Sequence, residues 1–145
     1  MRSILTSLIT AAFLTFGSTA AADQDKPHLL SIVTSASNDS QAMALILTRH
    51  HVQAGGSAQV LLCDTAAEMA LQDSDTGSTV VQPADASPRD MLGALMQAGV
   101  SVDVCAIFLP NREVTEADLR EGVGIARPDT IADIMGRPDT RLFTN

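Results

Sequence analysis

The residues of this chain best suited to covalent chemistry are its two cysteines, Cys63 and Cys105. Each lies at or near the carboxyl end of an apolar run that is typical of a buried strand in a parallel sheet. In open α/β sheets the loops at these strand ends hold the ligand. A thiol there becomes reactive when a helix N-terminus or a nearby cation favours the thiolate. Arg112 is the cation within loop reach of Cys105, and Asp64 opposes it.

The sequence leaves two interpretations of the cysteine pair open. If the strands ending near Cys63 and Cys105 are neighbours in register, parallel pairing places both cysteines on one face about 5 Å apart, within the range of a disulfide. Alternatively, both are small buried hydrophobic residues, the commonest fate of a free cysteine. Asp64 also has two roles open to it: it orients Arg112, or it caps the following helix, which is the role we favour.

The motifs of nucleotide, hydrolase and metal chemistry are missing from the sequence. It contains no Gly-x-x-x-x-Gly-Lys-Ser/Thr, no Gly-x-Gly-x-x-Gly after the first predicted strand, and no Gly-x-Ser-x-Gly. His50 and His51 are adjacent, about 100° apart around a helix, so the two rings cannot point into one metal site. His28 opens a strand without an obvious partner. We therefore expect no cofactor and no metal.

Residues 1–22 have the pattern of a signal peptide. Arg2 supplies the positive charge, residues 4–16 are mostly apolar but too short for the ~20-residue helix that spans a bilayer, and residues 20–22 offer a small-residue cleavage site. No cysteine lies near that site, which argues against a lipoprotein anchor. We expect residues 23–145 to form a single domain that is periplasmic or secreted, without a membrane span after cleavage.

The charge and aromatic content of residues 23–145 exclude a class of partner. The nine basic residues of the chain include Arg2, so eight remain against seventeen acids, which gives a net charge of −9 with His neutral. An acidic surface repels phosphate backbones, so we expect no nucleic-acid partner. The only aromatic residues in this range are Phe108 and Phe143, so stacking platforms for bases are also missing.

Strand and helix patterns alternate along the domain, which predicts an α/β fold with a mainly parallel sheet and helices on both faces. Between them, residues 72–86 form a long loop rich in turn residues. Asn38, Asp39 or Ser40 can cap the first helix, whose apolar first half suggests cover by another subunit. Ser87, followed by Pro88 and Asp90, is the predicted N-cap of the helix over 88–98. The predicted strands are 28–34, 58–64, 100–109, 123–126 and 140–144, and the predicted helices are 41–52, 66–71, 88–98, 116–121 and 128–135.

The ordered pattern of these elements resembles the DsrE/DsrF-like family of small sulfur-relay proteins, including its YchN-like branch. Four stretches carry the resemblance: the first strand and its polar turn (29–39), the strand with its Cys-Asp-Thr end (60–66), the helix, Gly-Val turn and cysteine-bearing strand (91–105), and a short helix ending in Gly-Val (118–123). The likeness spans roughly residues 28–145.

The resemblance implies a three-layer α/β/α domain with about five strands, assembled into trimers or hexamers. It also implies that Cys105 is the sulfur-bearing nucleophile, which carries sulfur as a persulfide, with Asp64 and Arg112 lining the same pocket. Cys63 stands where the family often has Ser or Gly, and in an oxidising periplasm it can pair with Cys105. The leading hypothesis is therefore an exported homo-oligomer that binds or transfers sulfane sulfur, a sulfurtransferase-like carrier. Its partner would be a sulfur donor or acceptor protein or a small sulfur compound.

Two other functions fit the same residues. The YchN-like branch has a second cysteine three residues after the first, where this chain has Phe108. That difference suits a non-catalytic oligomeric binding module that kept the fold and lost the relay. The third hypothesis is a thiol–disulfide redox switch that uses a reversible bond between Cys63 and Cys105.

Overall fold

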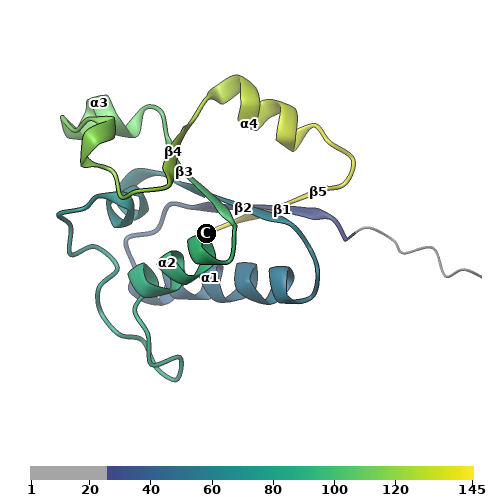
Figure 1. The fold of residues 1–145 in the computed structure, drawn as a ribbon, viewed down its shortest axis with the longest axis horizontal. Helices are drawn as coiled ribbons and strands as arrows, with labels where there is room; N and C mark the ends of the chain where they lie inside the picture. Colours follow the sequence, from purple (N-terminus) through teal and green to yellow (C-terminus); the bar gives the residue numbers. More distant parts are fainter. Residues whose placement is uncertain (1–25) are drawn as a thin grey trace, which may run out of the picture.

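The computed structural model describes residues 26–145 and shows a sheet of five strands, each parallel to its neighbours, in the order β4-β3-β2-β1-β5. Helices α1 and α2 cover one face, and α4 lies on the other (Figure 1). The predicted three-layer α/β/α architecture is therefore confirmed. The predicted signal peptide, residues 1–22, lies outside the described residues.

The elements follow the predicted order closely, with boundaries shifted by a few residues. No helix of residues 26–145 has the length and apolarity needed to cross a membrane. The strands are β1 (His28–Val33), β2 (Ala58–Leu62), β3 (Ser101–Cys105), β4 (Val123–Ala126) and β5 (Thr140–Thr144); the α-helices are α1 (Asn38–Gln53), α2 (Pro88–Gln97), α3 (Phe108–Arg112) and α4 (Pro128–Met135); and the 3₁₀ helices are η1 (Asp64–Ala70) and η2 (Glu116–Asp118).

The main hydrophobic core lies between the sheet and the α1–α2 layer. Successive side chains of a strand point to opposite faces, so alternate residues of β1, β2 and β3 enter this core. Helices α1 and α2 and the 3₁₀ helix η1 supply the rest of it. Its fully buried large residues include Val33, Leu45, Val60, Leu62, Met69, Leu92 and Val104.

The opposite face of the sheet has a much smaller core. Here the buried residues are Leu30, Leu61, Ala126 and Ile134, and α4, the element that supplies Ile134, is a helix of eight residues. The two cysteines pack against this second cluster. One short helix therefore covers the face of the sheet that carries both thiol-bearing positions.

The prediction of a strand over residues 100–109 is wrong in its second half. Strand β3 ends at Cys105, because Cys105 pairs with Ala126, the last residue of β4, and no strand continues beside it. The apolar residues that follow turn into α3, where the side-chain amide of Asn111 donates from Nδ2 to the Ile107 carbonyl oxygen at 2.6 Å. Pro110 is tolerated there, because the first-turn amides of a helix have no helical acceptor. An apolar run of this length does not distinguish a strand from a buried helical turn.

The helix starts were predicted with mixed success. At α2 the prediction is confirmed: Ser87 caps the helix and forms a capping box with Asp90, whose pKa is lowered by the hydrogen bonds that Ser87 donates to it. At α1 the predicted cap is wrong. Ser37, not one of the three residues after it, is the N-cap, and its side chain accepts from the Ser40 amide at 3.5 Å.

The long loop between η1 and α2 is held by one guanidinium group. Arg89 donates to the carbonyl oxygens of Met69, Leu71 and Gln72 at 3.2, 2.6 and 2.9 Å. Within the loop Gly77 is buried with φ +74°, and a Cβ built there would lie 2.6 Å from the sulfur of Met69. The loop is thus packed onto the core at that glycine.

We predict that Gly77→Ala destabilises the domain by about 3 kcal/mol, because a side chain there adds left-handed backbone strain and a clash with the buried Met69. Gly55→Ala is the matched control: its φ is +91°, but nothing lies within 4 Å of the added Cβ, so we expect about 1 kcal/mol. Urea unfolding of both variants measures the difference. Equal losses would show that the loop does not press on Met69.

Candidate functional site

The pairing of β2 with β3 brings the two cysteines together. Leu62 pairs with Val104, so the next residue of each chain segment, Cys63 and Cys105, lies at the same edge of the sheet. Their sulfur atoms form a disulfide with a Cα–Cα distance of 5.2 Å. The predicted proximity of the two cysteines is confirmed. The alternative interpretation, in which both are free buried thiols, is contradicted by the disulfide.

The disulfide opens onto a pocket of about 440 Å³ at the carboxyl ends of the strands, where ligands bind in open parallel sheets. All four residues singled out in the sequence line it, although their chemical roles stay predictions. The lining residues are Cys63, Asp64, Cys105, Ile107, Phe108, Asn111 and Arg112.

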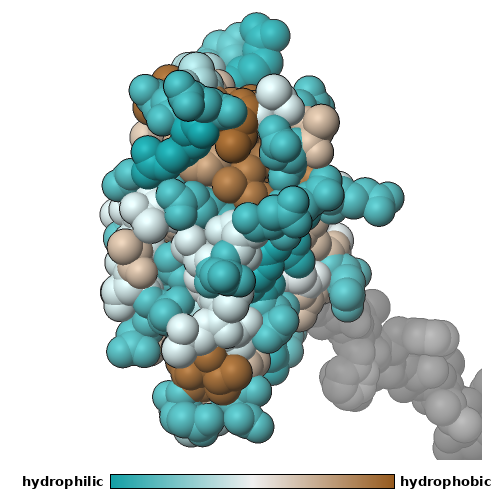
Figure 2. Space-filling view, turned by 90° about the vertical axis from the view of Figure 1, so that its left-hand side faces the viewer, coloured by the Kyte–Doolittle hydropathy of each residue, from teal (hydrophilic) through white to brown (hydrophobic). Residues whose placement is uncertain are grey.

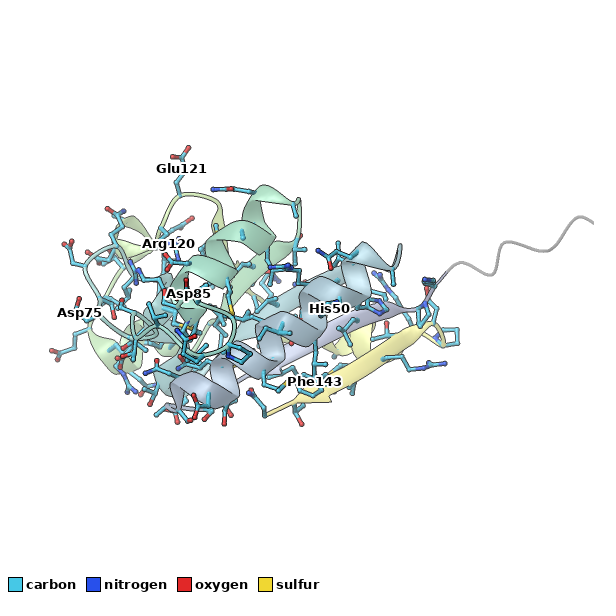
Figure 3. All side chains as sticks on the ribbon, turned by 90° about the horizontal axis from the view of Figure 1, so that it is seen from below. His50, Asp75, Asp85, Arg120, Glu121 and Phe143 are labelled. Atoms are coloured by element: carbon cyan, nitrogen blue, oxygen red, sulfur yellow. A yellow bond between two sulfur atoms is a disulfide. The ribbon has the colours of Figure 1, made fainter. Side chains whose placement is uncertain are left out.

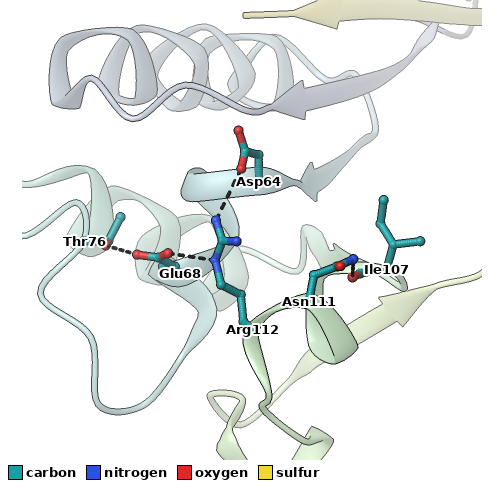
Figure 4. Close-up of polar contacts among 6 residues, drawn as sticks. All are labelled: Asp64, Glu68, Thr76, Ile107, Asn111 and Arg112. Carbon is teal, nitrogen blue, oxygen red and sulfur yellow. Dashed lines mark hydrogen bonds and ion pairs between the residues drawn. The ribbon is translucent and has the colours of Figure 1, made fainter.

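Arg112 enters this pocket from the end of α3 and is held by two carboxylates (Figure 4). Its Nη2 lies 3.3 Å from Asp64 Oδ1, and its Nε lies 3.2 Å from Glu68 Oε1. The guanidinium also lies 6.0 Å from the centre of the Phe108 ring. These contacts hold a cation in the pocket that the two cysteines also line, while the pair of carboxylates leaves the ion cluster with a formal charge of −1.

The helix-capping role that we favoured for Asp64 is wrong. The N-cap of η1 is Cys63, which makes no side-chain capping bond, and Asp64 itself has φ +50°. Its carboxylate faces the guanidinium of Arg112 (Figure 4). Residues with short polar side chains tolerate a left-handed backbone, which explains why an aspartate suits this turn. Asp64 therefore belongs to the ion cluster.

Glu68 is a site residue that the sequence analysis missed. It accepts a hydrogen bond from Thr76 Oγ1 at 2.9 Å through one carboxylate oxygen and contacts Arg112 through the other (Figure 4). It thereby joins α3 to the long loop. Glu68 follows Asp64 by four residues, and this spacing was the available signal in the sequence. The residue that both carboxylates contact is Arg112, which lies 44 residues after Glu68 in the chain and is brought near by the fold. Asn111 was missed as well: it lies in α3, a short helix that the sequence analysis did not predict after the strand over 100–109.

The three histidines lie away from this pocket. His50 is exposed on the outer side of α1 (Figure 3), and the Nε2 of His51 lies 2.8 Å from the Pro27 carbonyl oxygen. The ring of His28 lies 3.0 Å from Ser57 Oγ, and burial, followed by the charge of Arg137, lowers its pKa. Within residues 26–145 no three His, Cys, Asp or Glu side chains gather closely enough to hold a metal ion.

Comparison with solved structures assigns the fold. YchN from E. coli superposes with a TM-score of 0.63 at 19% identity, covering 83% of this chain and 99% of that one. MTH1491 from Methanobacterium thermoautotrophicum, described as a protein of unknown function, gives 0.58 at 16% identity, with 83% and 100% covered. The chain has a DsrE-like fold. No protein-family model and no curated protein matches its sequence.

The likeness to these two structures covers most of the DsrE-like domain, so the resemblance first seen in four short stretches is confirmed as a likeness of fold. Both comparison structures are matched along nearly their whole length. This chain thus spans nearly the whole of both comparison domains, and its own pocket lies at the edge where open parallel sheets bind ligands.

We predict that reduction of the disulfide lowers the free energy of unfolding of the DsrE-like domain by roughly 4 kcal/mol. The bond joins residues 42 apart, and releasing a loop of that length gives the unfolded chain an entropy gain of this size. Urea unfolding with and without a dithiol reductant measures it. The Cys63→Ser/Cys105→Ser double variant is the control and should not respond to reductant; an equal response would place the effect outside the disulfide.

Proposed function

We propose that this protein binds and transfers sulfane sulfur as a persulfide on Cys105, with Cys63 as the thiol that resolves it. The observation that carries the proposal is the disulfide between two strand-end cysteines that opens onto a pocket containing Arg112. The DsrE-like fold supports it. The sequence resemblance of residues 91–105 to the cysteine-bearing strand of sulfur-relay proteins supports it as well. The protein would act as a sulfurtransferase-like carrier without a cofactor.

The loading step starts from the dithiol, which an external dithiol reductant provides. The Cys105 thiolate attacks the outer sulfur of a donor persulfide, R–S–SH; the S–S bond of the donor breaks, its electron pair leaves on the thiolate RS⁻, and a new S–S bond forms on Cys105. Transfer is the same reaction in the opposite sense. An acceptor thiolate attacks the outer sulfur and returns Cys105 to the thiolate.

Cys63 gives the loaded site a second outcome. Its thiolate attacks Sγ of the Cys105 persulfide and expels hydrosulfide, which takes up a proton to give H₂S and leaves the observed disulfide. The net reaction of dithiol with R–S–SH yields disulfide, RSH and H₂S, so the atoms and electrons balance. The 5.2 Å Cα–Cα distance supports this step, because the two sulfur atoms meet without movement of the strands.

Arg112 is proposed to stabilise the anionic forms of Cys105. The thiolate and the persulfide anion both gain from a cation beside them. Asp64 and Glu68 hold the guanidinium of Arg112 at the pocket through ion pairs of 3.3 and 3.2 Å. Asp64 and Glu68 are therefore proposed as positioning residues that keep the charge in place, and the pocket beside them as the site where the donor or acceptor binds.

A thiol–disulfide redox switch is the second candidate, and the disulfide itself favours it. In this function the bond between Cys63 and Cys105 would open and close with the surroundings and change stability or assembly, without sulfur transfer. The non-catalytic binding module remains a third proposal. The buried Phe108 supports it, because it fills the position where the YchN-like branch has a second cysteine. Sulfur uptake by the reduced protein separates these two candidates from the carrier.

Export and assembly are part of the proposal. A disulfide persists in oxidising compartments, which supports the periplasmic or secreted location expected from residues 1–22. A trimer or hexamer is supported by apolar side chains that this chain alone leaves uncovered. On α1 these are Met43 and Leu47, with 54% and 44% of their surface exposed.

We predict that the reduced protein, exposed to polysulfide, takes up sulfur on Cys105 only. The Cys63→Ser variant should gain about 32 Da and keep it, because the resolving thiol is missing. The wild type should release H₂S and end about 2 Da lighter than the dithiol, as the disulfide forms. Intact-mass spectrometry and an H₂S assay measure both results. Sulfur retained by Cys105→Ser would overturn the assignment of Cys105, and uptake by neither protein would leave the redox switch or the binding module.

We predict that Arg112→Gln slows alkylation of the reduced Cys63→Ser variant at neutral pH, on the order of threefold to tenfold, because the thiolate of Cys105 loses its cation. Arg141→Gln is the matched control: it removes the same charge from an exposed side chain that binds only backbone carbonyls on the far strand β5. Iodoacetamide kinetics across a pH series measure the effect. Equal rates in the two variants would contradict a role for Arg112 at the thiol.

A further inference from the structure

The disulfide borders two recesses of different chemical character. Cys105 and Ile107 line the charged pocket described above, and they also line a second recess of about 300 Å³ between the end of β3 and α4. We call this second recess the apolar groove. Its lining residues are Leu61, Cys105, Ala106, Ile107, Ala126, Pro128, Ile131, Ala132 and Met135.

No side chain of the apolar groove carries a charge or a nitrogen or oxygen atom. Its rim includes Ile107, with 70% of its surface exposed, and Met135. Figure 2 shows apolar residues gathered at the upper end of the molecule, where α3 lies, between hydrophilic neighbours. A charged group placed in the groove would lose its hydration and gain no partner, whereas an apolar group would be stabilised by leaving water.

We propose that the apolar groove binds the uncharged organic group of a small thiol or persulfide whose sulfur reacts at Cys105. This inference rests on the proposed function and names its substrate class: an organic sulfur compound with an apolar group, rather than inorganic polysulfide or a charged thiol. We choose a sulfur compound as the ligand because Cys105 itself forms part of the groove wall, so a group bound in the groove places its sulfur next to the disulfide. The volume suits a group of one or two rings, since a cavity of about 150 Å³ already holds benzene.

The reaction at the groove is a thiol–disulfide exchange. The thiolate of the bound compound attacks Sγ of Cys105, the bond to Cys63 breaks, and the electron pair leaves on the Cys63 thiolate. A mixed disulfide between Cys105 and the organic thiol results, with no change in the total number of S–S bonds. A persulfide reacts at the Cys105 thiolate of the reduced protein in the loading step already described, with the organic group in the same groove.

The test compares benzyl mercaptan with 2-mercaptoethanol as they open the disulfide of the purified protein. Each rate is divided by the rate of the same thiol with a small model disulfide, which removes differences in thiol reactivity. We expect benzyl mercaptan to react on the order of tenfold faster after this correction, because its ring leaves water in the groove, and to show saturation. Intact-mass spectrometry should show its mixed disulfide on Cys105.

A matched pair of α4 variants locates the effect. Ala132→Glu places a carboxylate in the groove lining, and we expect it to bring the ratio of the two corrected rates close to one. Thr130→Glu adds the same charge at an exposed position of the same helix that does not line the groove, and we expect it to keep the ratio.

Three results would overturn the inference. Equal corrected rates for the two thiols in the wild type would remove the groove as a binding site while leaving Cys105 reactive, so the proposed function would stand. A ratio unchanged by Ala132→Glu, with dissociation of an oligomer seen by sedimentation, would make the groove a contact between copies of this chain. No reaction with either thiol would also overturn the inference, and it would contradict the proposed function only if the reduced protein failed to take up sulfur from polysulfide as well.

Discussion

The in-register parallel pairing of β2 with β3 is the constraint on which the rest of the site depends. It brings Cys63 and Cys105, 42 residues apart in the chain, to a Cα–Cα distance of 5.2 Å. Because both strands end there, the segments that follow them leave the sheet together and form the walls of the pocket. A shift of one residue in this register would turn one cysteine to the opposite face and leave Arg112 facing no thiol pair.

The ion cluster and the disulfide tie together the same two segments of chain in different ways. The disulfide is covalent and joins the strand ends, whereas the contacts of Arg112 with Asp64 and Glu68 join the η1 and α3 segments beyond them. Ion pairs this exposed contribute little to stability, about 0–1 kcal/mol each. Their importance lies in where they hold a positive charge, which is in the pocket onto which the disulfide opens.

Sequence reasoning found what depends on local pattern and missed what depends on long-range packing. The alternation of apolar runs with capped helices predicted all five strands, and the strand ends predicted which cysteines, acid and base would meet. The turn after Cys105 was mistaken for a strand because its apolar residues show neither strand nor helix periodicity. Strand β3 ends at Cys105 because the neighbouring strand β4 ends beside it at Ala126, which the sequence of the turn does not reveal. The contact of Glu68 with Arg112 and the apolar groove could not be predicted, because each is formed by segments that lie far apart in the chain.

The unequal cover of the two faces of the sheet has a consequence for dynamics. Helix α4 is short and contributes one buried residue, Ile134, to a cluster with three buried residues of the sheet, whereas the α1–α2 layer packs on the main core. Elements with the least buried apolar surface open locally most often. Amide hydrogen exchange should therefore be faster in α4 than in α1 or α2. Each such opening would uncover the α4 side of the disulfide without unfolding the sheet. A protein-sized reductant would then reach Cys105 during an opening of α4, without having to fit the closed surface of the domain. Under the proposed function, the same would hold for a protein that accepts sulfur.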